Sequence, residues 1–209
     1  MADLVLYTNP MSRGRIARWM LEEVGVPYRR EILTFGGTMK NDDYRRTNPM
    51  GKVPTLVHGD KIVTECAAVC AYLADTFPDA GLAPPLSERA DYYRWLFFAA
   101  GPLEAAVTNR ALGVELPADK RAMVGYGSYS DVMETLDLAL SGKTYLSGDR
   151  FTAVDVYVGS HLMWGLQFGS IEKRPAFEAY IAHLHQRPAH LRATELDDAD
   201  MQEMQQSQG

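Results

Sequence analysis

The sequence predicts a segment that mixes strands and helices, followed by an entirely helical segment, which is an α/β plus all-α fold class. In residues 1–79, short apolar runs alternate with helical patterns. Residues 79–88, DAGLAPPLSE, are rich in Pro and Gly and are typical of a linker. Beyond them the chain has helical patterns and no hairpin signal. We therefore expect one domain over residues 1–79, a linker over 80–87 and a helical domain over 88–209.

The first strand and helix have clear local signals. DLVLYT, at residues 3–8, predicts a strand, and PYRREIL, at residues 27–33, predicts a second one. Between them, RGRIARWMLEEVG predicts a helix that Gly25 ends. Its apolar residues at helical spacing are Ile16, Ala17, Met20, Leu21 and Val24. Because a crossover helix joins the two strands, we expect them to be parallel.

Two further strands and a helix complete the predicted sheet domain. Residues 35–50 are polar and predict a loop with a short helix. VPTLVHGDKIVTE, at residues 53–65, predicts two strands joined by the turn Gly59–Asp60. CAAVCAYLADTF, at residues 66–77, predicts a helix. The order βαβ–ββα predicts a four-stranded mixed sheet with helices on its faces.

The second segment predicts helices throughout. Residues 88–111 form a long helical pattern that is interrupted near Gly101–Pro102. Residues 117–140 predict another helix, and three shorter ones follow up to about residue 193. The acidic, Gln-rich tail from about residue 195 is expected to fray.

Composition and charge narrow the functional classes. The net charge of −6 argues against general binding to nucleic acid or to an anionic membrane. No apolar run approaches the roughly 18 residues of a membrane helix, and the N-terminus lacks the basic start of a signal peptide. Cys66 and Cys70 are expected to be thiols in the cytoplasm. His183, His185 and His190 have no recognised metal spacing, and we expect no metal.

Ser12 directly precedes a helical pattern, in the stretch YTNPMSRGR. It is a natural N-cap, and a helix N-terminus presents unpaired amides and the positive end of the helix dipole. A thiolate placed there is stabilised, and a hydroxyl that donates to the sulfur adds to the effect. The simpler interpretation is that Ser12 only caps the helix.

Two other stretches could bind a peptide-like ligand. In NPMGKVPTL, a cis bond before Pro54 would turn the backbone of Val53 outward to pair with an extended peptide. An ordinary trans proline at a strand start is the alternative. In IVTECAAV, Glu65 could hold an ammonium group and the Cys66 amide a carboxylate, although Glu65 also suits a first helical turn without any ligand.

Taken together, these motifs resemble the cytosolic glutathione transferase family. The resemblance runs from LVLYTNPMSRGRIARWMLEE through NPMGKVPTL and TECAAVCAYLAD to FTAVDV, where Thr152 and Asp155 have the spacing of a capping box. It implies a thioredoxin-like N-terminal domain, an α-helical domain and assembly as a homodimer. It also implies glutathione as co-substrate and a role in detoxification.

The resemblance assigns roles to the N-terminal motifs. Ser12 is similar to the thiol-activating serine of the theta, delta and zeta-like classes, and Asn9 is a second candidate for contact with the sulfur. Val53, before Pro54, is similar to the backbone clamp on the cysteinyl unit of glutathione. The remaining glutathione-binding candidates are Lys40 and Lys52 for the glycyl carboxylate, Glu65 for the γ-glutamyl ammonium, and Cys66 where the family usually has serine.

The expected reaction is conjugation of glutathione to a small hydrophobic electrophile. Candidate residues for the apolar wall of the electrophile site are Met11, Ala100, Leu103 and Trp164, although each of them also suits packing in the interior of the helices. A glutathione-dependent isomerase, dehalogenase or disulfide reductase is the alternative on the same scaffold. A non-enzymatic binding module is a further alternative, which the cysteine at position 66 keeps open.

Overall fold

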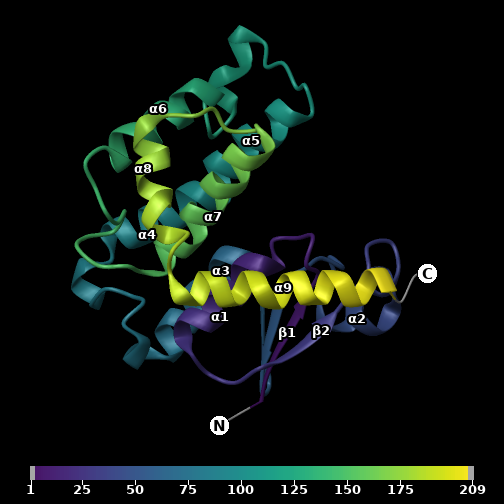
Figure 1. Ribbon diagram of the computed structural model, residues 1–209. Helices are drawn as coiled ribbons and strands as arrows, with labels where there is room; N and C mark the ends of the chain where they lie inside the picture. Colours follow the sequence, from purple (N-terminus) through teal and green to yellow (C-terminus); the bar gives the residue numbers. More distant parts are fainter. Residues whose placement is uncertain (1–2, 207–209) are drawn as a thin grey trace. The chain divides into compact units, whose positions relative to one another are not determined.

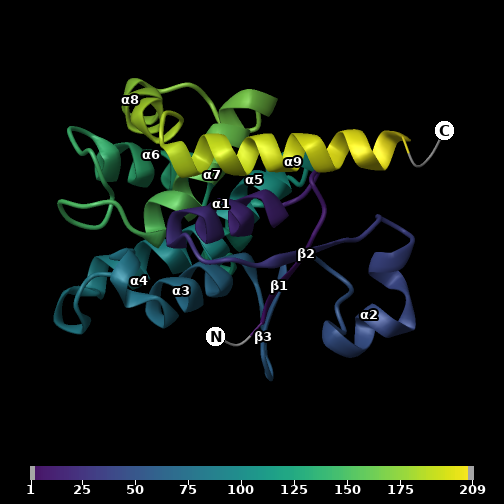
Figure 2. The same ribbon diagram turned by 60° about the horizontal axis from the view of Figure 1, so that its bottom comes forward.

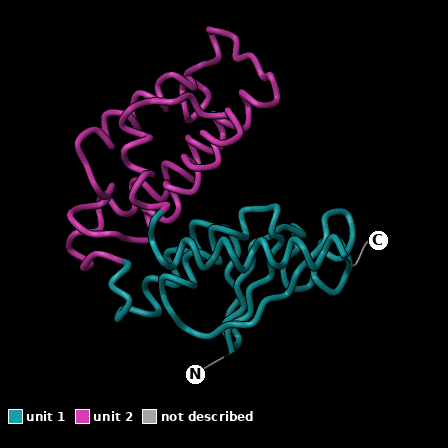
Figure 3. The backbone as a smooth tube through the Cα atoms, in the orientation of Figure 1, with its two compact units in different colours: residues 1–82, 186–209 teal, residues 83–185 magenta. Residues whose placement is uncertain are grey.

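The computed structural model describes residues 3–206 and divides them into two compact units (Figure 3). The first unit contains the residues up to Leu82 together with those from Gln186 onward, and the second runs from Ala83 to His185. The C-terminal segment therefore belongs to the N-terminal unit, which differs from the domain limits expected from the sequence.

The first unit is built on a four-stranded sheet whose order is β2-β1-β3-β4. β1 and β2 are parallel, and the other two pairs are antiparallel, as the predicted βαβ–ββα order requires. The strands are β1 (Leu4–Thr8), β2 (Arg29–Ile32), β3 (Thr55–His58) and β4 (Lys61–Thr64). The α-helices are α1 (Gly14–Val24), α2 (Asp42–Thr47), α3 (Cys66–Thr76) and α9 (Pro188–Gln206), with 3-10 turns at Thr38–Lys40 and Pro78–Ala80.

Helix α1 forms where the apolar spacing predicts it. Ile16, Met20 and Leu21 are buried in the core of the first unit. Gly25 ends the helix in the left-handed conformation, with φ of 74°, and its amide donates to the carbonyl of Leu21. α1 packs against α3 on the sheet, and α9 lies along α1 (Figures 1 and 2).

The second unit is helical, as predicted. Its α-helices are α4 (Ala90–Phe98), α5 (Glu104–Ala111), α6 (Tyr129–Leu140), α7 (Ala153–Phe168) and α8 (Pro175–Leu184), with 3-10 turns at Leu86–Glu88 and Ala118–Met123. α4 and α5 are joined by a π-helical turn, Ala99–Leu103, because Pro102 cannot supply an amide to the helical ladder. The stretch 117–140 was expected to be one helix and is instead a 3-10 turn and α6, separated around Gly127.

The capping box at the start of α7 is present as predicted. The carboxylate of Asp155 accepts the Thr152 amide, and the Thr152 hydroxyl accepts from the first turn. Asp155 also accepts hydrogen bonds from the Leu146 amide and the Tyr180 hydroxyl. Burial raises the pKa of the Asp155 carboxyl, and this residue fixes the core of the helical unit.

For the described part of the tail, the expectation of fraying is wrong, because α9 continues to Gln206. Residues 207–209, to which the expectation also applied, lie outside the described residues. Four acidic residues of this tail, Asp197, Asp198, Asp200 and Glu203, are paired with arginines of the first unit. Arg18 is fully buried. Its Nε lies 3.2 Å from Oδ1 of Asp197, and its Nη2 lies 2.5 Å from Oδ2 of Asp200. Arg30 bonds to Asp200 and to Glu203. These ion pairs fix the last helix onto α1 and β2.

Within residues 3–206, no helix is long and apolar enough to cross a bilayer.

Candidate functional site

The register of the sheet brings the three motif turns to one edge. Tyr7 of β1 lies opposite Thr55 of β3, and Thr55 lies opposite Thr64 of β4. The Ser12 turn follows β1, the Val53–Pro54 bond precedes β3, and the Glu65–Cys66 turn follows β4. All three therefore lie at the edge of the sheet where β1 ends, which we call the motif edge.

Ser12 lies in the turn that leads into α1, one residue before the N-cap. The helix begins at Gly14 with Arg13 as its N-cap, which corrects the expectation that Ser12 itself occupies that position. The half-buried Ser12 hydroxyl accepts from the Gly14 amide at 3.0 Å and donates to the Asn9 carbonyl at 2.7 Å. The hydroxyl therefore still satisfies a first-turn amide, and it can redirect its proton toward a ligand by rotating about one bond.

The side chain of Asn9 has a structural role. It is fully buried, donates to the Leu33 carbonyl at 2.7 Å and accepts from the Met11 amide at 2.9 Å. These bonds hold the end of β1 against the segment that follows β2. The structure thus favours Ser12 over Asn9 as the group that meets a ligand.

Gly14 is required by a close approach to Thr8. A Cβ added at Gly14 would lie 2.0 Å from the Thr8 hydroxyl oxygen, and Thr8 is fully buried. The glycine lets the start of α1 pack directly on the end of β1, and this packing sets the position of the Ser12 turn.

The bond between Val53 and Pro54 is cis. In the described part of the chain, neither the amide nor the carbonyl of Val53 has a hydrogen-bond partner within the protein. These groups are available to an extended ligand, as strand addition requires.

Three side chains that the sequence analysis missed support this bond. The Tyr44 hydroxyl and the side-chain amide of Asn48 both donate to the Lys52 carbonyl. The same two groups bond to the Thr55 hydroxyl, at 2.8 Å and 3.0 Å. Together they anchor the backbone on both sides of Val53–Pro54. Asn48 lies inside the motif NPMGKVPTL, so the motif did contain a signal for it.

The two candidate lysines differ in their surroundings. Lys40 donates to the carbonyls of Met50, at 3.1 Å, and Gly51, at 2.6 Å, and so holds the loop that leads to the cis bond. The side chain of Lys52 is exposed. The structure therefore favours Lys52 over Lys40 as the group that meets a ligand carboxylate.

Glu65 has an unusual backbone conformation. Its φ is 65° and its ψ is 117°, and among residues 3–206 no other non-glycine residue has a positive φ. Side chains are disfavoured there, and residues held in such conformations cluster at binding sites. The conformation turns the chain abruptly from β4 into α3 and leaves the Glu65 side chain exposed at the motif edge.

Cys66 joins two of the motif turns. It is the first residue of α3, it is 8% exposed, and its thiol donates to the Arg13 carbonyl across 3.6 Å. The N-termini of α1 and α3 are thereby neighbours at the motif edge. Both termini present backbone amides, which favour bound anions. The arrangement suits a ligand with more than one negative group.

The family model and the individual relatives that match this chain point to the same family. The family model described as "Glutathione S-transferase, N-terminal domain" matches residues 11–76. Glutathione S-transferase 3 of Zea mays is 30% identical in an alignment 169 positions long, which covers 74% of this chain and 75% of that protein. The chain belongs to the glutathione S-transferase family. The resemblance based on the motifs is therefore confirmed.

Other members of the glutathione S-transferase family match nearly the whole chain. Glutathione S-transferase GST-4.5 of Xanthomonas campestris is 28% identical in an alignment 214 positions long, which covers 98% of each chain. The crystal structure of a glutathione transferase from Methylococcus capsulatus superposes with a TM-score of 0.77 at 27% identity, covering 94% of this chain and 99% of that one. A sphingomonad glutathione S-transferase, solved with glutathione, gives a TM-score of 0.75 at 26% identity and covers 93% of this chain and 98% of that one. The predicted thioredoxin-like and helical architecture is confirmed.

Of the four side chains expected to line an electrophile site in this glutathione S-transferase family member, Leu103 is a wrong choice. It is 0% exposed in the core of the helical unit, where it cannot contact a substrate. Ala100 is exposed and Trp164 is half-buried in the same unit. Met11, in the first unit, is 59% exposed.

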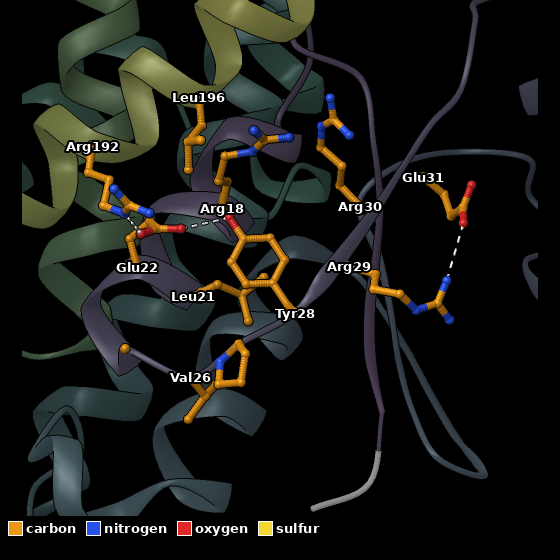
Figure 4. Close-up of a pocket in the computed structure, with 12 residues that line it drawn as sticks. Arg18, Leu21, Glu22, Val26, Tyr28, Arg29, Arg30, Glu31, Arg192 and Leu196 are labelled. Atoms are coloured by element: carbon orange, nitrogen blue, oxygen red, sulfur yellow. Dashed lines mark hydrogen bonds and ion pairs between the residues drawn. The ribbon is translucent and has the colours of Figure 1, made fainter.

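A separate groove of about 1000 Å³ lies beside α1, β2 and α9 in the first unit (Figure 4). Its arginines are paired with carboxylates: Arg29 with Glu31, and Arg192 with Glu22. It contains none of the residues predicted for glutathione. We therefore assign no chemistry to it. No group of three metal-ligating side chains occurs among residues 3–206.

Proposed function

We propose that this chain conjugates the thiolate of glutathione to a small hydrophobic electrophile. The observation that carries the proposal is the meeting of three turns at the motif edge, with the Ser12 turn and the Glu65–Cys66 turn in contact through Cys66 and Arg13. Family membership supports the same reaction.

Each part of glutathione finds a complementary group at the motif edge. Glu65 takes the γ-glutamyl ammonium, and the Cys66 amide takes the adjacent carboxylate. The backbone of Val53 pairs with the cysteinyl unit. Lys52 meets the glycyl carboxylate. The cis bond and the unpaired Val53 backbone support the central contact.

The Ser12 hydroxyl and the N-terminus of α1 stabilise the sulfur as a thiolate. For this, the hydroxyl exchanges its bond to the Asn9 carbonyl for one to the sulfur. Lowering the pKa of a thiol from about 8.5 to about 6.5 requires about 2.7 kcal/mol of preferential stabilisation of the anion. The thiol releases its proton to water, and the thiolate attacks the electrophilic carbon. As the carbon–sulfur bond forms, the bond from that carbon to the leaving group breaks and the leaving group takes its electron pair; in an addition, the π electron pair moves to the neighbouring atom, which then takes a proton from water.

We also propose a cytoplasmic homodimer. In the second unit, Tyr93 and Phe97 lie one turn apart on α4 and are 42% and 72% exposed, which suits a surface that a second copy covers. Light scattering after gel filtration tests the assembly, and a mass of one chain would contradict it.

The function is tested by glutathione binding and by turnover of a chromogenic electrophile. We expect free glutathione to raise the melting temperature and the protein to catalyse conjugation. If glutathione does not raise the melting temperature and the protein does not catalyse conjugation, a non-enzymatic binding module is favoured instead. Turnover of a disulfide substrate without conjugation would favour a reductase.

A further inference from the structure

Arg15 connects the Ser12 turn to the C-terminal helix. Its Nε donates to the Pro10 carbonyl at 2.5 Å, and its Nη2 pairs with Asp198 of α9 at 2.7 Å. Pro10 lies inside the turn that carries Ser12. A residue of the last helix therefore reaches the thiol-activating turn through one intervening side chain.

The chemistry of the guanidinium makes this connection directional. Its donors lie in one plane in a rigid fork, so a carboxylate on one side fixes the direction of the donors on the other. With Asp198 in place, the Nε–H of Arg15 points at the Pro10 carbonyl. Without Asp198, the guanidinium gains freedom to turn toward solvent, and the carbonyl loses its restraint.

We propose that Asp198 is a positioning residue for the thiol chemistry: through Arg15 and the Pro10 carbonyl, it holds the turn that aims the Ser12 hydroxyl at the sulfur. The inference rests on the proposed function. It makes α9 part of the machinery that ionises glutathione, although Asp198 touches neither the tripeptide nor Ser12.

Two other ion pairs, between α1 and the C-terminal segment that begins at Gln186, lack this connection. Arg192 of α9 bonds to Glu22 at 2.8 Å, and Arg187 bonds to Glu23 (Figure 4 shows Arg192 and Glu22). Glu22 and Glu23 lie in the last turn of α1, at the opposite end from Ser12. Arg192 and Asp198 are similarly exposed, 67% and 56%. Arg192→Gln is therefore a matched control that weakens the docking of α9 without disturbing the Ser12 turn.

The test compares Asp198→Asn, Asp198→Glu and Arg192→Gln with the parent protein. We expect Asp198→Asn to lower kcat for conjugation about fivefold, the upper end of the effect of an exposed ion pair. The pKa of the bound glutathione thiol should rise, with little change in KM for glutathione. Asp198→Glu should recover most of the loss, and Arg192→Gln should match the parent.

A second measurement needs no glutathione. In NMR spectra of the free protein, the amide signals of Met11 and Ser12 should shift in Asp198→Asn and stay in place in Arg192→Gln. If they shift alike in both variants, or in neither, the proposal is overturned. Equal losses of activity in the two variants would also overturn it, because α9 would then act only on stability. If the parent protein does not bind glutathione as a thiolate, the proposed function is contradicted. In that case the amide signals of Met11 and Ser12 alone show whether Asp198 holds the Ser12 turn.

Discussion

The thiol of Cys66 lies 3.6 Å from the carbonyl oxygen of Arg13, although 53 positions separate the two residues in the chain. This contact places the N-terminus of α3 against the N-terminus of α1. The Glu65–Cys66 turn and the Ser12 turn are thereby held together at the motif edge. The motif resemblance implies serine at this position, so the thiol offers a direct test of what the side chain contributes to glutathione binding.

Replacing the thiol by a hydroxyl should improve glutathione binding. A hydroxyl is a stronger donor than a thiol, and it can turn from the Arg13 carbonyl to the γ-glutamyl carboxylate of bound glutathione. A hydrogen bond to such a charged group contributes about 1.5–3 kcal/mol. We expect Cys66→Ser to lower the Kd for glutathione by about tenfold, measured by titration calorimetry. Cys66→Ala, which keeps only the backbone amide, is the control and should bind no more tightly than the parent. Weaker binding by the serine variant would show that this side chain does not face the ligand.

A Gly14→Ala substitution should disturb the fold and the site together. The added methyl meets the buried Thr8 hydroxyl, and overpacking of this kind costs about 1–3 kcal/mol of unfolding free energy. We expect urea denaturation to show that loss and glutathione binding to weaken, because the Ser12 turn is displaced. Gly101→Ala is the control, since nothing lies within 4 Å of its added Cβ. Equal stability of the two variants would contradict the close approach of α1 to β1.

The positive φ of Glu65 predicts that replacing this residue by glycine affects protein stability and glutathione binding in opposite directions. Glycine tolerates a positive φ, so Glu65→Gly should relieve strain of about 1–3 kcal/mol, offset in part by the greater entropy of the unfolded chain. The same change removes the carboxylate that holds the γ-glutamyl ammonium. We expect a protein at least as stable as the parent that binds glutathione at least about tenfold more weakly. Glu65→Gln should lose affinity without the gain in stability. Undiminished binding in both variants would remove Glu65 from the site.

Asp197 should make stability depend on pH. Burial raises the pKa of its carboxyl to about 7, although Arg18 and Arg15 act in the opposite direction. The folded-state pKa lies above the unfolded value of about 3.9, so the folded state binds more protons than the unfolded state between these two pKa values. The protonated Asp197 carboxyl therefore contributes fully to stability below about pH 3.9, and this contribution is lost as the pH rises through about 7. The free energy of unfolding should therefore fall between pH 5 and pH 8.

Asp197→Asn is the matching variant for this prediction. It cannot ionise, so its free energy of unfolding should change less between pH 5 and pH 8 than that of the parent. Urea denaturation at the two pH values measures both. An identical pH dependence in parent and variant would show that another group is responsible.

Local signals predicted the elements of the fold well. The apolar spacing in residues 16–24 and the turn at Gly59–Asp60 correctly predicted α1 and the β3–β4 hairpin. Such patterns report which face of an element is buried, and this is determined within a few residues. The capping box at Thr152 and Asp155 is equally local, and it was found for the same reason.

Features that depend on distant partners were missed. The acidic, Gln-rich tail was expected to fray, because its arginine partners are far away in the chain: Arg18 is 182 positions from Asp200, and Arg30 is 170. Likewise, the sequence suggested Asn9 as a ligand contact, because it does not show that the Asn9 side chain bonds to the Leu33 carbonyl, 24 positions away. Leu103 is apolar in either role, so only its burial excluded it from a substrate wall.

The ionisation of bound glutathione tests the central role of Ser12 most directly. Ultraviolet absorbance of the thiolate, followed against pH with saturating glutathione, gives the pKa of the bound sulfur in the parent protein and in Ser12→Ala. Ser130→Ala, on the exposed first turn of α6, is the control. We predict a pKa well below that of free glutathione in the parent and in the control, and a value raised by at least about 1 in Ser12→Ala, equivalent to about 1.4 kcal/mol. An unchanged pKa in Ser12→Ala would contradict the account.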